Sequence, residues 1–267
     1  MTALLLILIP VVAGVLTFFL KEAQQARLTA MVASIASLAI LVVALTTAGT
    51  GGFSYTAAWL PQLGAQFALE MDGASKVLAL LTVLAYPLIL LATWNNRYEQ
   101  PNQFFALLLL AQAGILGVFL AADGLLFYFF WELALIPVYF LCSRWGGERR
   151  IAATFKFFLY TFVGSLLMLV GLVYLYYQTP GGSFALRDLY AVQLSEAQQA
   201  WLFWMFFVAF AIKMPVFPFH SWQPDTYEQA PTAVTMVLSA LMVKMGLFAV
   251  IRWLIPLFPE AASQYNN

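Results

Sequence analysis

Cysteine, histidine and charged residues are all scarce in this chain of 267 residues. It has one cysteine, Cys142, and one histidine, and its charged residues make up 9% of the sequence, against about 25% in an ordinary soluble protein. A lone cysteine excludes an internal disulfide and an iron–sulfur cluster held by cysteines of this chain. Because 12 basic residues balance 12 acidic ones, the chain also lacks the basic field that binding to nucleic acid requires.

Apolar residues dominate instead. They form 63% of the chain, against about 45–50% in soluble domains, and the mean hydropathy is +0.87. Spanning helices need about 20 mainly apolar residues, and the sequence predicts an all-α, polytopic transmembrane helix bundle of about eight helices. The predicted helices cover residues 3–20, 28–47, 76–93, 103–120, 125–142, 151–177, 198–219 and 232–254. The first is expected to be an uncleaved helix, because no positive residue precedes it and no cleavage site follows it.

Basic residues in the connections indicate the orientation in the membrane. The loops after the first, third and fifth helices hold six of them, whereas the other loops hold only Arg187, with Lys76 at the start of the third helix. The six are Lys21, Arg27, Arg97, Arg144, Arg149 and Arg150. Since positive loops stay on the cytoplasmic side, we expect the amino terminus to lie outside.

Two connecting segments have recognisable local signals. Residues 53–69 have strand-like residues on both sides of a turn from Pro61 to Gly64, which predicts a small external hairpin. In the loop 179–196, Ser195 is placed to cap the seventh helix.

Four ionisable residues fall inside the predicted spans: Glu132, Lys156, Lys213 and Lys244. A charge near the centre of a spanning helix costs about 2.5–3.5 kcal/mol, so such residues are expected to face each other or water and to serve a function. Glu132 has no residue of opposite charge near it on its own helix, and Lys213 is its natural partner. The pair is either a proton-handling pair or a structural ion pair between helices. Lys156 lies next to a basic loop, so it is either functional or a lysine that extends to the interface.

The segment 211–231 contains four prolines, which forbid a regular helix and predict that the seventh helix is broken. Pro215 and Pro218 cannot donate to the carbonyls of Ala211 and Met214, so we expect free acceptors on both sides of Lys213, and water beside it.

The only histidine, His220, follows this break. It is either a proton relay to the cytoplasmic surface or an interface histidine that bonds Asp225 or Glu228. No metal site is expected, because one histidine and two loop carboxylates lack the spacing of metal ligands.

Several segments together resemble a known family. They are FYFFWELALIPVYFL at 127–141, WGGERR at 145–150, TFKFFLYT at 154–161, KMPVFPFHSWQPD at 213–225, WLP at 59–61 and MDGAS at 71–75. These segments are similar to the antiporter-like membrane subunits of complex I, NADH:quinone oxidoreductase, within the group called subunit M or chain 4. The resemblance extends over essentially the whole chain, although Gln223 stands where the family usually has leucine.

The resemblance implies a proton-translocating subunit of an oxidoreductase, in which proton transfer uses Glu132, Lys213, Lys244 and, with lesser standing, Lys156. His220 joins these candidates because of its residue type and its place after the break. By that similarity Glu132 is the fifth-helix glutamate that modulates the seventh-helix Lys213, and Lys244 is the eighth-helix lysine of the central hydrophilic axis. No cofactor is expected on this chain. NADH, FMN, iron–sulfur clusters and quinone would belong to other subunits, and the partners would be neighbouring antiporter-like subunits and lipid, in a bacterial inner membrane or, less favoured, a mitochondrial one.

The resemblance also implies a division of the chain. Residues 1–98 would form three amino-terminal helices and the hairpin, and residues 99–267 a five-helix antiporter-like unit. Complete members continue into a second, inverted five-helix unit, so we expect this chain to be an amino-terminal portion or a split form, the first half of an inverted-repeat fold. A subunit of a sodium/proton antiporter or of a membrane-bound hydrogenase remains the alternative, because these would share the Glu and Lys arrangement and the broken helix.

Overall fold

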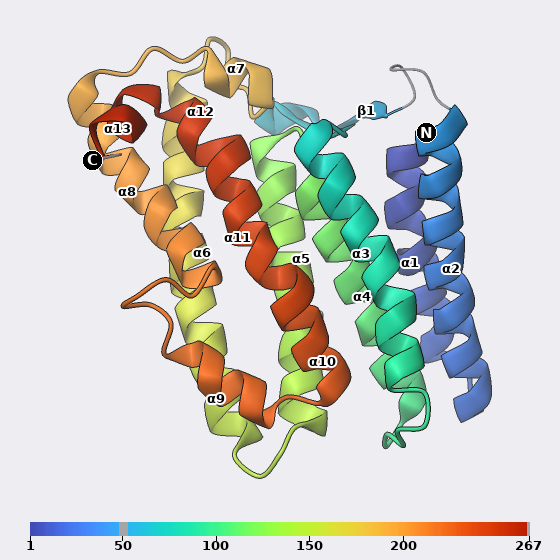
Figure 1. Ribbon diagram of the computed structural model, residues 1–267. Coiled ribbons are helices and arrows are strands. Elements are labelled where there is room, and N and C mark those ends of the chain that lie inside the picture. Colours follow the sequence, from blue (N-terminus) through green and yellow to red (C-terminus); the bar gives the residue numbers. More distant parts are fainter. Residues whose placement is uncertain (48–52, 266–267) are drawn as a thin grey trace.

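The computed structural model describes residues 1–47 and 53–265, and most of these residues form helices that run side by side (Figure 1). The helices before the break are α1 (Thr2–Phe18), α2 (Ala23–Thr47), α3 (Gly73–Ala92), α4 (Pro101–Leu120), α5 (Gly124–Trp145), α6 (Arg150–Gln178), α7 (Leu186–Tyr190) and α8 (Glu196–Lys213). The later ones are α9 (Trp222–Gln229), α10 (Thr232–Val237), α11 (Val243–Ala249), α12 (Ile255–Leu257) and α13 (Pro259–Gln264).

Within the described residues, six helices are long and apolar enough to cross a membrane. They are α2, α3, α4, α5, α6 and the helix Thr232–Leu257, which joins α10 to α12. The apolar α1 has 17 residues. The polar first turn of α8 lowers its hydropathy, although α8 runs alongside the others in Figure 1. With these two, the described chain has the eight helical passages that the sequence predicts, and it is a multi-pass membrane protein.

The last two passages are irregular. The seventh is broken, as predicted: α8 ends at Lys213 and α9 begins at Trp222. The eighth passage contains two π-helical stretches, η2 (Leu238–Met242) and η3 (Val250–Leu254), on either side of α11. The sequence gives no expectation of these stretches, which occur frequently at functional sites.

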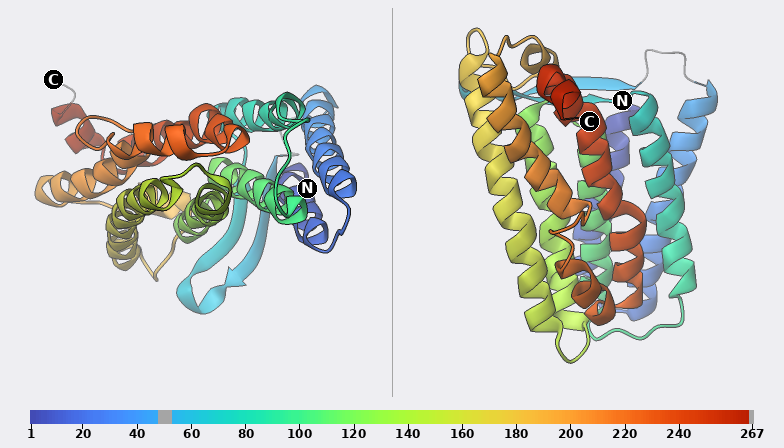
Figure 2. Two further views of the ribbon diagram at one scale, coloured as in Figure 1. Left: turned by 90° about the horizontal axis from the view of Figure 1, so that it is seen from below. Right: turned by 60° about the vertical axis from the view of Figure 1, so that its left-hand side comes forward.

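An antiparallel hairpin lies across one end of the bundle and projects to one side of it (Figure 2). Its strands are β1 (Ser54–Leu60) and β2 (Ala65–Glu70), joined by the 3-10 turn η1 (Pro61–Leu63). Gly64 ends the turn with φ of 61°, a conformation that glycine adopts without strain. The hairpin and its turn are where the sequence predicts them.

Helix α4 lies at the centre of the bundle and packs against α1, α2, α3 and α5. Close approach between α4 and α5 depends on Gly114, because a Cβ there would lie 2.5 Å from the backbone nitrogen of Ala134. Lipid provides no hydrophobic driving force for helices to associate in a membrane. Small residues such as this glycine let the two backbones approach closely, and the resulting van der Waals contact holds the helices together. The contact fixes the central turn of α5, which carries Glu132.

The loops fall at two opposite ends of the bundle (Figures 1 and 2). The hairpin, α7 and α13 share one end, and the connections after α1, α3 and α5 share the other with α9. The six predicted basic loop residues therefore lie at the same end as α9, the helix that follows the break.

Candidate functional site

Helix α5 is fixed at its first turn by Asp123. One carboxylate oxygen accepts from the backbone N–H groups of Leu125 and Leu126, both at 3.0 Å, which caps the helix. The other oxygen accepts from the N–H of Gln66 in β2, also at 3.0 Å. One buried carboxylate therefore joins the hairpin to the helix that carries Glu132.

Glu132 is half-buried, and its Oε1 is buried without a hydrogen-bond partner in the described structure. Its side chain lines a groove of about 350 Å³ between α5 and the end of β1. Trp59 and Leu60 form the hairpin side of this groove, and the other lining residues of α5, such as Phe129 and Ile136, are apolar or aromatic. The surface of the groove is therefore apolar, and Oε1 of Glu132 lies buried behind it.

Lys213 is the last residue of α8 and is only 2% exposed. Its Nζ has no hydrogen-bond acceptor among the described residues and lies 5.3 Å from the centre of the Trp131 ring. Trp131 in turn packs against Phe210 of α8. The ammonium is thus held by aromatic packing rather than by a carboxylate.

Glu132 and Lys213 do not form a direct ion pair between α5 and α8 in the described structure. The ion pairs of the described residues lie elsewhere. Trp131, the neighbour of Glu132 on α5, lies against Lys213 instead, and the two charged side chains still act on each other electrostatically without direct contact. Their proton-transfer role stays a prediction.

The break after Lys213 is partly closed by hydrogen bonds. Val216 donates to the carbonyl of Ala211 at 2.9 Å, so this acceptor is not free, contrary to the expectation. The indole N–H of Trp222 donates to the carbonyl of Ile212, also at 2.9 Å, and ties α9 to the end of α8. No hydrogen bond of the described residues ends on the Met214 carbonyl.

Lys156 and His220 lie near the end of the bundle that carries the basic loops. Lys156 donates to Asp225 of α9 at 2.9 Å, and the pair is partly exposed. This hydrogen bond and the lysine charge hold the pKa of the Asp225 carboxyl below its usual value. His220 is exposed and packs against Phe217, and among the described residues it makes neither of the bonds to Asp225 or Glu228 that the second of its two interpretations requires. Glu228 pairs with Arg149 instead, at 3.0 Å.

Lys244 lies in α11, between the two π-helical stretches. Its Nζ donates to the carbonyl of Ser239 at 2.6 Å, within η2. Two residues on, Gly246 brings this helix against the end of α8: a Cβ there would lie 2.6 Å from Met214 Cγ and 2.9 Å from the Phe210 carbonyl. The helices that carry Lys213 and Lys244 therefore touch beside the break.

Sequence reasoning missed Arg252, which is 6% exposed in η3. It pairs with Asp72 at 2.9 Å and donates to Ser75 at 2.5 Å, which joins the eighth passage to the start of α3. Arg252 lies two helical turns after Lys244 on the same apolar passage, and this position in the sequence is enough to mark it as a second ionisable residue within the span. Within residues 1–47 and 53–265, no three His, Cys, Asp or Glu side chains converge as metal ligands would.

Comparison with known proteins adds independent findings. The profile of the NADH:quinone oxidoreductase/Mrp antiporter transmembrane family matches residues 121–267. The chain is 38% identical to F(420)H(2) dehydrogenase subunit M of Methanosarcina mazei, over 98% of this chain and 54% of that protein. It is also 38% identical to NADH-quinone oxidoreductase subunit M of Escherichia coli K12, over 78% of this chain and 42% of that protein. The chain thus spans about half the length of the curated relatives it matches.

Solved structures share this fold. A chain of respiratory complex I from Thermus thermophilus superposes with a TM-score of 0.88 at 34% identity, over 99% of this chain and 55% of that one. A chain of the Mrp complex from Dietzia sp. superposes with a TM-score of 0.83 at 20% identity, which is a likeness of fold.

Proposed function

Since the chain belongs to the NADH:quinone oxidoreductase/Mrp antiporter family of membrane proteins, we propose that it is a proton-translocating membrane subunit of an NADH:quinone oxidoreductase. The observation that carries this proposal is Lys213, whose ammonium is buried, unpaired in the described structure and placed where α8 breaks. A buried ionisable residue at a broken membrane helix is typical of ion pathways.

The chemistry of the site suits a gated proton carrier. A lysine amine in an apolar interior can take or release a proton, and a carboxylate that moves closer favours the charged form. Glu132 lies on the same turn of α5 as Trp131, which packs on Lys213, so a small rotation of α5 would change the distance between the two charges. Glu132 is the modulating group in this proposal, and Lys213 carries the proton.

Lys244, Lys156 and His220 take different positions along the proposed proton pathway. Lys244 would continue the path, because its helix packs on the end of α8 beside Lys213. Lys156 and His220 lie nearer the end with the basic loops and would serve at the entrance. We assign the pathway to residues 99–267, and the family match at 121–267 lies inside this range.

The groove beside Glu132 supports a protein partner. Its lining surface is apolar, so apolar side chains of a neighbouring membrane subunit would fill it. We propose antiporter-like subunits as these neighbours, with NADH, FMN, iron–sulfur clusters and quinone on other chains. The proposed location is a bacterial inner membrane with the hairpin end outside.

One relative favours a different electron donor for the complex. The match to an F(420)H(2) dehydrogenase subunit covers nearly the whole chain, so the complex could receive electrons from reduced F420 rather than NADH. The likeness to the Mrp complex keeps a cation/proton antiporter, and by analogy a membrane-bound hydrogenase, as alternatives. All of these would use the same lysines.

Lys213→Ala and Glu132→Gln in the assembled complex test the proposal. Each should lower proton uptake by membrane vesicles, and the coupled quinone reduction, by at least about tenfold, because proton transfer loses a required group. Oxidation of the electron donor by an artificial acceptor should stay near normal. Arg187→Ala is the control, since it removes an exposed charge at the hairpin end. Full proton uptake in the Lys213→Ala variant would show that the lysine is structural only.

A further inference from the structure

Arg252 is buried in the eighth passage, near the hairpin end of the bundle. Its side chain is only 6% exposed, although it lies close to the end of the span Thr232–Leu257. Arginine side chains near the ends of membrane helices usually extend to the interface, because a charge inside the membrane is costly. The burial of this guanidinium therefore depends on partners within the protein.

The partners of the Arg252 side chain lie at the start of α3. Its Nη1 pairs with Oδ2 of Asp72 at 2.9 Å and donates to Oγ of Ser75 at 2.5 Å. The other oxygen of Asp72, Oδ1, accepts from the backbone N–H of Ser75 at 2.8 Å and so caps α3. One carboxylate thus begins α3 and also holds the eighth passage, so the guanidinium is attached to the helix itself.

The backbone at Arg252 is held by a different element. Pro256 has no N–H, so the Arg252 carbonyl lacks the donor that an α-helix would supply four residues later. The hydroxyl of Tyr190, on the short helix α7, donates to this carbonyl instead. The side chain and the backbone of one residue are therefore attached to two neighbouring elements.

The same passage carries Lys244. Phe248 is four residues from Lys244 and four from Arg252, a spacing that brings side chains to one side of a helix. The Phe248 ring lies 5.7 Å from Cζ of Arg252 and 5.3 Å from the ring of Phe119 on α4. Because π-helical stretches flank the short α11, contacts with neighbouring helices hold Lys244 in its direction.

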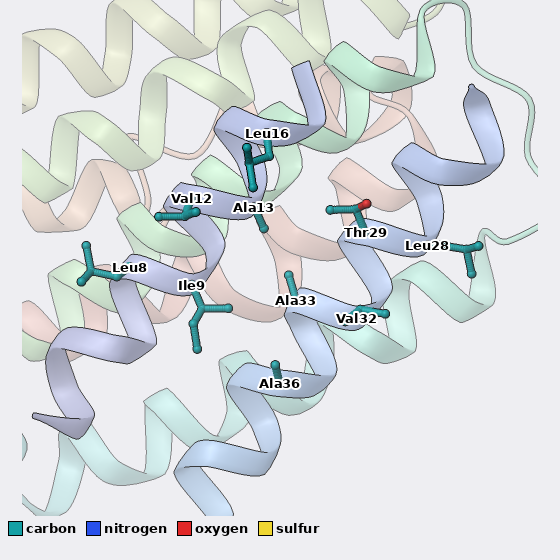
Figure 3. A pocket seen from close by; sticks show the side chains of 10 residues that line it. All are labelled: Leu8, Ile9, Val12, Ala13, Leu16, Leu28, Thr29, Val32, Ala33 and Ala36. Atoms are coloured by element: carbon teal, nitrogen blue, oxygen red, sulfur yellow. The ribbon is translucent and has the colours of Figure 1, made fainter. Parts of the chain in front are cut away.

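The amino-terminal helices meet the rest of the bundle with different chemistry. Helix α3 runs beside the eighth passage and packs against α10 and η2 (Figures 1 and 2). At the edge of the bundle, α1 and α2 form a groove with ten lining side chains, of which Thr29 alone is polar (Figure 3). In the part of the chain that the structure describes, the ion pair with the eighth passage comes from the start of α3.

We propose that Arg252 is a positioning residue for proton transfer. It attaches the eighth passage to α3 through Asp72 and to α7 through Tyr190, and this attachment keeps Lys244 beside the break in the seventh helix. The inference rests on the proposed role of Lys244. It extends the functional unit beyond residues 99–267, because the carboxylate that holds Arg252 belongs to the amino-terminal helices.

Two variants in the assembled complex remove the ion pair from either side. Arg252→Gln removes the charge, and Asp72→Asn removes the carboxylate but keeps an oxygen that can cap α3. Proton uptake per donor oxidised, normalised to the amount of assembled complex, should fall about fivefold in each, because Lys244 is misplaced rather than lost. The double variant should lose no more than either single variant if the two residues act as a pair.

A conservative variant and a matched control separate positioning from packing. One nitrogen of Arg252 makes both contacts with α3, so the ammonium of Arg252→Lys can replace it and should keep at least about half of the uptake. Glu70→Gln removes a carboxylate two residues before Asp72 that pairs with the exposed Arg187, at 3.9 Å. This control should leave proton uptake unchanged.

Full uptake in the Asp72→Asn or Arg252→Gln complex would overturn the inference. A loss in Arg252→Lys as large as in Arg252→Gln would also overturn it, because the residue would then serve packing alone. If Arg252→Gln does not assemble, Asp72→Asn decides, since its side chain is exposed. Lys213→Ala in the same vesicles tests the proposed function separately: if it abolishes uptake and the Arg252 variants do not, only the positioning role fails.

Discussion

At the scale of single residues, the buried ammonium of Lys213 has an aromatic ring beside it and no hydrogen-bond acceptor in the described structure. Insertion of a lysine at this depth costs about 2.5–3.5 kcal/mol. A desolvated cation over a tryptophan ring recovers about 2 kcal/mol, and Trp131 supplies such a ring at 5.3 Å. The ring therefore offsets much of the insertion cost of the charged lysine.

Replacement of Lys244 by alanine should lower proton uptake far more than replacement of His220 does. Among the described residues Lys244 bonds only the Ser239 carbonyl of its own passage, and its helix packs beside the break, so Lys244→Ala should lower vesicle proton uptake as much as Lys213→Ala does. His220 is exposed, where water can replace it as a proton carrier, so His220→Ala should cause a milder loss. Proton uptake per donor oxidised, measured in membrane vesicles, distinguishes the two. Equal losses would contradict an entrance role for His220.

Asp225 makes the attachment of α9 to α6 sensitive to acid. Lys156 lowers the pKa of Asp225 in the folded state, so the pair stabilises α9 at pH values above the unfolded pKa of about 3.9. This stabilisation is lost as the pH falls through the lower, folded pKa. Hydrogen exchange of the α9 amides, corrected for intrinsic rates, should therefore accelerate only below about pH 4. The Asp225→Asn variant should lack this transition, and a transition that persists would assign it to another group.

At the scale of elements, the close contact of α11 with α8 depends on Gly246. Gly246→Val should lower the free energy of unfolding by about 1–3 kcal/mol, because the Phe210 carbonyl and the Met214 side chain would have to move. It should also reduce proton uptake more than stability alone explains, since it separates the helices of Lys213 and Lys244. Thermal unfolding and vesicle assays measure the two effects. Gly73→Ala is the control, because no atom lies within 4 Å of a Cβ placed there.

The elements differ in how far the sequence predicts them. The hairpin, the break after Lys213 and the Ser195 cap follow from local residues, namely the Pro61 to Gly64 turn, the prolines and the capping serine. The π-helical stretches around Lys244 depend on how one passage packs against its neighbours, and no local residue pattern specifies them. The hydrogen bond from the Val216 N–H to the Ala211 carbonyl likewise depends on how the chain turns after Pro215, which the sequence does not specify.

At the scale of the whole molecule, periodic hydropathy predicts the number of passages, because lipid demands long apolar helices. It does not predict which side chains meet. By sequence Lys213 is the obvious partner of Glu132, yet its ammonium lies 5.3 Å from the centre of the Trp131 ring and makes no ion pair with Glu132 in the described structure. The ion pair of buried Arg252 with exposed Asp72 joins elements far apart in sequence, so only the folded arrangement shows it.

The orientation of the whole bundle can be tested with cysteines at its two ends. Cys142 is buried, so the chain offers little background for a membrane-impermeant maleimide, and Cys142→Ala removes it. Gln62 is exposed at the hairpin turn, and Glu148 is exposed in the loop after α5. Because the basic loops should stay in the cytoplasm, Gln62→Cys should be labelled in right-side-out vesicles and Glu148→Cys only in inverted ones. The reverse pattern would place the broken helix, His220 and the proposed proton entrance on the outer side.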